Sequence, residues 1–248
     1  IGIKKLSLVE KLSEAIVLKN RMSFTEDQLK KDITLIKNIL KVNGYYFANV
    51  KSSLVSNKEL NSVRLKLDID QGVKAKIKKI TFIGDKKIKD KKLLEVIASE
   101  EHRFWKFVSN RVYLNQNTIS LDKRLLENYY KNLGYHQVKV LNSFAEFTEK
   151  GHFKLVFNIN AGTQFFFNDL KLNLPDDYDN SDFKKVEKIF SKLKGERYSL
   201  DDFNKILSEI DNIASSRLYD FIDAQVEETI IDNKINFTFN VADSAKVY

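Results

Sequence analysis

Hydrophobic and polar residues alternate in three separate places along the chain, and each place predicts a strand with one buried face. The apolar positions are Val63, Leu65, Leu67 and Ile69 in the first, Phe153, Leu155, Phe157 and Ile159 in the second, and Ile235, Phe237, Phe239 and Val241 in the third. A turn follows each strand, at Gly72, at Gly162 and at Asp243-Ser244. The recurrence of one local pattern indicates an internal repeat.

The stretch from residue 74 to residue 163 shows one complete unit of this repeat. Its predicted elements are a strand at 77–83, a helix at 90–99, a second helix at 117–132, a strand from 135 to about 145 and a strand at 152–160. Apolar residues recur every three or four positions in the helices. The order is therefore βααββ, which predicts an α+β fold class for each unit.

Landmarks at fixed spacing place three such units in one frame. Each of three arginines is followed 23 residues later by a helix-ending residue: Arg21 by Gly44, Arg111 by Gly134 and Arg197 by Asp220. Glycine, and to a lesser degree aspartate, suits the left-handed conformation that ends many helices. The repeat period is about 80 to 90 residues.

The landmarks predict units at residues 1–73, 74–163 and 164–245, with residues 246–248 beginning a further unit. Ile1-Gly2 aligns with Ile83-Gly84, the end of the first strand of the second unit. We therefore expect most of the first strand of the first unit to be missing, and the chain to be part of a longer protein.

The repeat resembles the POTRA domains that precede an outer-membrane barrel in BamA and its relatives. The most specific stretches run from Phe104 to Tyr113 and from Leu126 to Tyr135, and they look like the third POTRA domain of that family. The three units would then be the second, third and fourth. The resemblance implies a three-stranded mixed sheet packed against two helices in each unit. It also implies that the chain is the periplasmic portion of an outer-membrane protein of a Gram-negative bacterium.

In POTRA domains the second strand of each unit lies at the sheet edge, where another extended chain can add by β-augmentation. The resemblance thus implies docking edges at 47–54 and 137–144. The candidate protein-binding residues are Phe47, Ala48 and Val50 in the first unit and Gln137, Val138, Lys139, Val140 and Leu141 in the second. An alternative is that neighbouring units or loops cover these edges.

The second unit carries about eight extra residues between its helices, near 100–108. Phe104, Trp105 and Phe107 gather there, and they form either a flap over that unit's own core or a contact with a partner. Because family members hold a β-propeller lipoprotein, BamB, at the third POTRA domain, the strand Val138 to Leu141 is a candidate site for an accessory protein.

A formal charge of +8 and a pI of about 9.3 also raise the possibility of a nucleic-acid-binding module. Lysine supplies most of the positive charge, and the lysines are spread along the chain among acidic residues. Arginine, the usual bidentate reader of bases and phosphates, occurs at only seven positions. This distribution favours a solvated surface, and we predict no nucleic-acid partner.

The residues that carry catalysis are scarce. The chain has no cysteine, and His102, His136 and His152 stand in no metal-ligand spacing. No nucleophile elbow, dinucleotide loop or phosphate loop occurs. We therefore predict no enzyme activity, catalytic residue, metal, cofactor or small-molecule substrate.

The resemblance implies a periplasmic scaffold of the outer-membrane β-barrel assembly machinery. Its partners would be unfolded outer-membrane proteins, the periplasmic chaperones that deliver them, and Bam accessory lipoproteins, one of them BamB-like at the second unit. POTRA domains of a TamA-like or two-partner secretion barrel are the nearest alternative, and the barrel sequence would separate these systems. A basic nucleic-acid-binding module is the alternative from another class.

Overall fold

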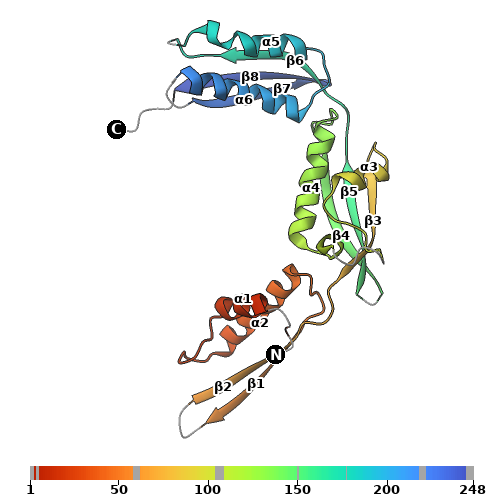
Figure 1. Cartoon of the computed structure of the whole chain (residues 1–248), viewed down its shortest axis with the longest axis vertical. Helices are drawn as coiled ribbons and strands as arrows, with labels where there is room; N and C mark the ends of the chain where they lie inside the picture. Colours follow the sequence, from red (N-terminus) through yellow and green to blue (C-terminus); the bar gives the residue numbers. More distant parts are fainter. Residues whose placement is uncertain are drawn as a thin grey trace. The chain divides into compact units, whose positions relative to one another are not determined.

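The computed structural model in Figure 1 describes residue 3 and residues 6–57, 62–103, 109–149, 151–176, 178–217 and 222–243. The chain divides into two compact units. Unit 1 consists of residues 1–81, 97–123 and 143–157, and unit 2 consists of residues 82–96, 124–142 and 158–248. The three sequence repeats are called repeat 1, repeat 2 and repeat 3 below, and repeat 2 contributes segments to both units.

Helices and strands follow the predicted order along the chain. Repeat 1 contains α1 (Leu6–Ala15), α2 (Glu26–Val42), β1 (Asn49–Asn57) and β2 (Ser62–Asp70). Repeat 2 contains β3 (Lys76–Asp85), α3 (Asp90–Val96), the short 3-10 helix η1 (Asn110–Val112), α4 (Gln116–Lys131), β4 (Lys139–Glu149) and β5 (His152–Asn160). Repeat 3 contains β6 (Phe166–Asn173), η2 (Asn180–Phe183), α5 (Lys184–Leu193), α6 (Leu200–Arg217), β7 (Ile222–Ile231) and β8 (Lys234–Asp243).

A side chain caps the N-terminus of the second helix in repeats 1 and 2. The Thr25 hydroxyl accepts a hydrogen bond from the Gln28 N–H at 3.3 Å at the start of α2. The Asn115 side-chain oxygen accepts from the N–H groups of Asn117 and Thr118, at 2.9 and 3.1 Å, at the start of α4. These acceptors satisfy donors that the first turn of a helix leaves without a partner.

Glycine ends both of these helices, as the repeat predicted. Gly44 and Gly134 adopt φ values of 90° and 91°, in the left-handed region that a side chain rarely occupies. The equivalent Asp220 of repeat 3 lies outside the described residues.

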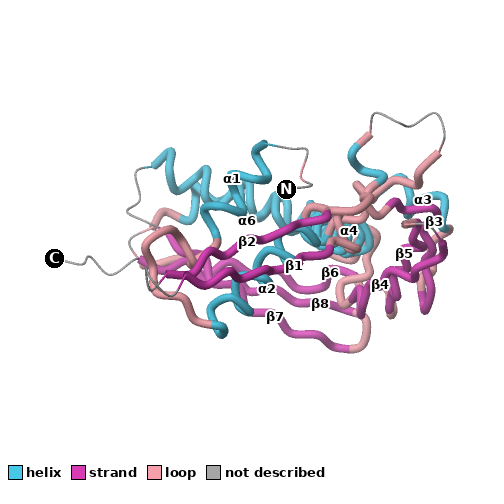
Figure 2. The backbone as a smooth tube through the Cα atoms, turned by 90° about the horizontal axis from the view of Figure 1, so that it is seen from below, coloured by secondary structure: helices cyan, strands magenta, loops and turns pink. Residues whose placement is uncertain are grey.

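The third strand of repeats 2 and 3 lies in the centre of its sheet. The strand orders are β3-β5-β4 and β6-β8-β7, and Figure 2 shows β6, β8 and β7 side by side. In repeat 3, β6 pairs parallel with β8 while β7 pairs antiparallel with it, so that the sheet is mixed. This arrangement confirms the fold that the resemblance implied.

Repeat 1 shows two paired strands in the part of the chain that the structure describes. β1 and β2 are antiparallel, with Asn49 opposite Asp70 and Asn57 opposite Ser62. Along β2 lies a hollow whose lining includes Leu18, Met22 and Val63. Among the described residues, the sheet of repeat 1 thus consists of β1 and β2.

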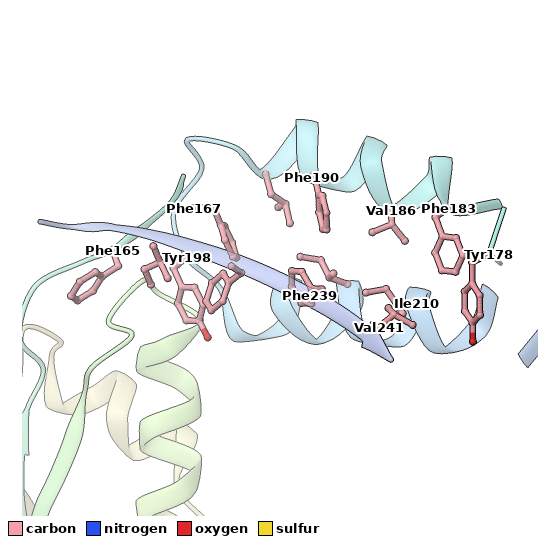
Figure 3. Close-up of a cluster of buried hydrophobic side chains, with 14 residues drawn as sticks. Phe165, Phe167, Tyr178, Phe183, Val186, Phe190, Tyr198, Ile210, Phe239 and Val241 are labelled. Atoms are coloured by element: carbon pink, nitrogen blue, oxygen red, sulfur yellow. The ribbon is translucent and has the colours of Figure 1, made fainter. Parts of the chain in front are cut away.

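Aromatic residues dominate the core of repeat 3. Figure 3 shows Phe190 of α5 beside Phe239 of β8, and their rings stack with centroids 5.6 Å apart. Phe203 of α6 meets Phe237 of β8 with centroids 4.9 Å apart. The alternation predicted for residues 235–241 thus directs Ile235, Phe237, Phe239 and Val241 into this core.

Repeat 1 has a smaller aliphatic core. Leu8 and Leu12 of α1, Ile36 and Leu40 of α2 and Val50 of β1 are all buried in it. The two helices thus pack together over the start of β1.

Candidate protein-binding edges

The second strand of each repeat occupies an edge of its sheet. β1 pairs only with β2 among the described strands, β4 lies outside β5, and β7 lies outside β8. An edge strand has a row of backbone donors and acceptors that its own sheet does not pair. The strand order therefore provides the chemistry that β-augmentation requires, at the positions that the resemblance implied.

The candidate residues of repeat 1 surround the start of β1. Phe47 and Ala48 precede the strand, which begins at Asn49, and Val50 is buried within it. Farther along, Leu54 and Val55 expose 44% and 64% of their surface. This edge thus combines unpaired backbone with accessible apolar side chains.

Phe47 belongs to an aromatic cluster within unit 1. Its ring lies 5.6 Å from that of Phe147 and 5.9 Å from that of Phe153, measured between centroids. Phe47 and Phe147 each remain about half exposed, whereas Phe153 is buried. The cluster holds Phe47 in place and leaves part of its ring accessible.

In repeat 2 the edge strand begins later than the sequence indicated. β4 starts at Lys139, and the preceding residues form a turn in which the Val138 N–H donates to the Tyr135 carbonyl at 3.1 Å. Gln137 and Val138 therefore lie before the strand. The predicted strand start at Tyr135 was wrong because the chain turns once more after the helix-ending glycine.

Within β4 the candidate side chains alternate in exposure. Val140 is buried, whereas Leu141 exposes 54% of its surface. The Val140 N–H donates to Oε1 of Glu127 on α4 at 2.9 Å. One donor of this edge is thus already occupied by a side chain of the same repeat.

Two buried aspartates, which the sequence pattern did not single out, accept hydrogen bonds from the connections between the two helices of repeats 1 and 2. In repeat 1, Asp32 of α2 accepts hydrogen bonds from the Val17 and Leu18 N–H groups and from the Gln28 side-chain amide, the last two at 2.8 Å. Burial raises the pKa of Asp32, but these hydrogen bonds outweigh it, so that the net pKa lies below its usual value. The ionised carboxylate thereby anchors the segment that follows α1.

Asp122 of α4 occupies the equivalent place in repeat 2, 90 residues later. Its Oδ1 accepts from the Ala98 and Ser99 N–H groups, at 2.6 and 3.1 Å. Burial raises the pKa of Asp122, and the nearby Ser99 hydroxyl, followed by the Ala98 and Ser99 N–H groups, reduces that rise without reversing it. The Asp122 Oδ2 and Ser99 Oγ atoms are nevertheless buried with no hydrogen bond of normal geometry.

The sequence contained a signal for these two carboxylates. Asp32 and Asp122 are 90 residues apart and therefore occupy the same place in the repeat. Each lies four positions after a polar residue of its helix, Gln28 in the first case and Thr118 in the second. A carboxylate that recurs at one place of a repeat indicates a structural hydrogen bond. Glu127 carried no such signal, because position 37 in repeat 1 is lysine.

The aromatic residues of the insertion in repeat 2, Phe104, Trp105 and Phe107, lie outside the described residues. In the portion that the structure covers, no group of three or more histidine, aspartate or glutamate side chains is arranged to hold a metal ion. No helix there is both long and apolar enough to span a membrane.

A protein-family model described as POTRA, surface antigen variable number repeat, matches residues 5–72 and 75–162. These ranges cover more than half of the chain and coincide closely with repeats 1 and 2. Repeat 3 is related to them by its sheet, since β6-β8-β7 has the same order as β3-β5-β4.

Two curated relatives are outer-membrane protein assembly factors named BamA. The protein from Neisseria meningitidis serogroup B is 22% identical over 258 aligned residues, which cover 100% of this chain and 32% of the relative. The protein from Buchnera aphidicola is 23% identical over 182 residues, which cover 71% of this chain and 27% of the relative. The chain thus spans about a third or less of the length of these relatives.

Among solved structures, POTRA3-5 of Haemophilus influenzae BamA superposes with a TM-score of 0.53 at 15% identity. The match covers 98% of this chain and 93% of that structure. At this identity the likeness concerns the fold.

Proposed function

Because this chain belongs to the POTRA family, we propose that it is a binding scaffold, without enzyme activity, of the outer-membrane β-barrel assembly machinery. It is the periplasmic portion of an outer-membrane protein. In this proposal it binds unfolded outer-membrane proteins delivered by periplasmic chaperones, and its own barrel continues the protein beyond the matched region.

The observation that carries the proposal is the edge position of the second strand in each sheet. Backbone hydrogen bonds at an edge bind an extended chain with little dependence on its sequence. Such tolerance suits a scaffold whose clients are unfolded β-barrel proteins of many sequences. The names of the relatives, which are outer-membrane protein assembly factors, favour the same role.

Titration of the isotope-labelled chain with a peptide from an outer-membrane barrel strand tests this function. We expect the amide shift changes to lie in the edge strands β1 and β4 rather than in the helices. A peptide of the same length in which proline replaces alternate residues should give much smaller changes, because its backbone lacks the donors that pair with an edge. Changes confined to the helices would contradict binding at the edges.

Docking of an accessory lipoprotein of the BamB kind is proposed for the start of β4. Leu141, which is 54% exposed, provides an apolar contact there. Leu141→Glu should weaken this binding about tenfold, since burying a charge without a partner is costly. Leu121→Glu on α4, where leucine is 37% exposed, is the matched control and should leave binding unchanged. Equal losses for both variants would contradict the assignment.

POTRA domains of a TamA-like or two-partner secretion barrel remain the alternative. The BamA names of the curated relatives favour the assembly machinery. The assignment of the repeats to the second, third and fourth POTRA domains stays a prediction.

A further inference from the structure

Glu127 distinguishes the edge of repeat 2 from that of repeat 1. We infer that its carboxylate closes the start of the β4 edge to an extended peptide, and that the β1 edge accepts such a peptide in preference. The inference rests on the proposed function, in which strands add at these edges. It assigns the choice between two similar edges to one side chain.

The hydrogen bond at Val140 indicates which donor is closed. In a sheet, successive N–H groups of an edge strand point alternately toward its neighbour and away from it. The Val140 N–H donates at 2.9 Å to Glu127, a residue of α4 rather than of β5. We therefore take it as an outward donor, one of those that an added strand needs.

An incoming peptide would have to replace this interaction. A hydrogen bond to an ionised carboxylate is stronger than one between two neutral amides. The peptide carbonyl that approached Val140 would also meet the negative charge of Glu127, which repels its oxygen. Both the stronger hydrogen bond already present and the repulsion of the peptide carbonyl thus disfavour addition at the start of β4.

Repeat 1 lacks this closure at the equivalent place. Val50 corresponds to Val140, and the two are similarly buried, with 8% and 5% exposed, which supports the alignment at this point. The residue 90 positions before Glu127 is Lys37, whose ammonium donates hydrogen bonds and accepts none. Across the described ranges, no side chain accepts from the Val50 N–H.

The occupant that fits the β1 edge is an extended peptide with alternating apolar side chains. Its backbone can pair with the outward groups of β1. Its apolar side chains, which lie on one face, can pack against Leu54 or, in the other register, against Val55, which are 44% and 64% exposed on opposite faces of the sheet. The chemistry of this edge is therefore that of an added strand, and no other ligand class is required.

Single cysteines can report on the two edges, because the chain has none of its own. Ser52→Cys and Asn142→Cys occupy equivalent exposed positions, and Ser215→Cys on α6 is an exposed control away from the edges. The probe is a peptide of about ten residues, the length of a barrel strand, that alternates valine and threonine around one cysteine. This cysteine is supplied as a disulfide with thionitrobenzoate, so that the protein thiolate forms the mixed disulfide and thionitrobenzoate leaves. Mixed-disulfide yield is measured for each position and divided by its rate with a small disulfide reagent, which corrects for thiol reactivity.

We expect capture at position 52 to exceed capture at position 142 about tenfold, the scale of one charged hydrogen bond. Glu127→Ala should raise capture at 142 by a similar factor, whereas Glu127→Gln, which keeps an acceptor oxygen but removes the charge, should raise it by a smaller factor. Lys37→Glu should lower capture at 52. Circular dichroism checks that each variant is folded. The Lys37→Glu variant lies on α2, so that its result does not depend on the folding of α4.

Two outcomes are kept apart by this design. Equal capture at 52 and 142 that Glu127→Ala and Lys37→Glu leave unchanged would overturn the role of Glu127 while supporting binding at the edges. Capture at 52 and 142 no higher than at 215, in every variant, would overturn edge binding itself and with it the proposed function.

Discussion

Repeats 1 and 2 use an aspartate at the same buried place for the same structural purpose, yet the pKa values of the two carboxylates are shifted in opposite directions. Asp32 and Asp122 each accept hydrogen bonds from two successive N–H groups between the helices of their repeat. Asp32 also receives the Gln28 amide, and its pKa is lowered, whereas Asp122 has a buried oxygen without a good partner and a raised pKa. The backbone geometry of the repeat is therefore conserved more strictly than its electrostatics, because the number of donors depends on single neighbouring side chains.

The largest expected difference between the repeats is the loss of stability when each buried aspartate is replaced by asparagine. Asp32→Asn should destabilise repeat 1 by about 2 kcal/mol, because its NH₂ group would face donors that both oxygens now satisfy. Asp122→Asn should change the stability of repeat 2 by less than about 1 kcal/mol, since Oδ1 can still accept from Ala98 and Ser99. Urea titrations followed by hydrogen exchange at Leu18 and Ser99 measure each repeat locally. A larger loss for Asp122→Asn would refute the comparison.

A smaller difference is expected at the helix-ending glycines. Alanine at Gly44 or Gly134 should cost about 1 to 2 kcal/mol, because both positions have positive φ. At Gly44 the added methyl group would meet the Leu114 backbone carbonyl at 3.2 Å, whereas at Gly134 it would meet the Arg197 side chain, which can move. Gly44→Ala should therefore be the more destabilising in thermal unfolding, and Gly134→Ala combined with Arg197→Ala should recover part of its loss.

The smallest expected effect is on the pH dependence of stability. The lowered pKa of Asp32 stabilises the folded state above the ordinary value of 3.8, and this contribution is lost as the pH falls through the folded-state pKa. The raised pKa of Asp122 has the opposite sign: its contribution is complete below 3.8 and is lost as the pH rises through the folded-state pKa. Asp32→Asn should flatten the acid limb of the stability profile, and Asp122→Asn the limb above 3.8. Identical profiles for the two variants would contradict the assigned directions.

The fold was largely predictable because its signals are local. Alternating residues such as Phe237 and Phe239 form the buried face of β8, and the glycines at 44 and 134 adopt the helix-ending conformation that their spacing indicated. The start of β4 was less predictable. Residues 135–138 were predicted to begin the strand, but the hydrogen bond from the Val138 N–H to the Tyr135 carbonyl closes a turn, and β4 begins only at Lys139.

The sequence by itself determined the repeat, the order of its elements and the residues near two candidate edges, since periodicity and turn residues act over short distances. Only the tertiary structure decided that β1, β4 and β7 are edges in their sheets and that Glu127 reaches the Val140 N–H. Those facts depend on which strands pair and on which side chain of a helix meets a strand 13 residues later. Such contacts follow from packing, and no local pattern in the chain specifies them.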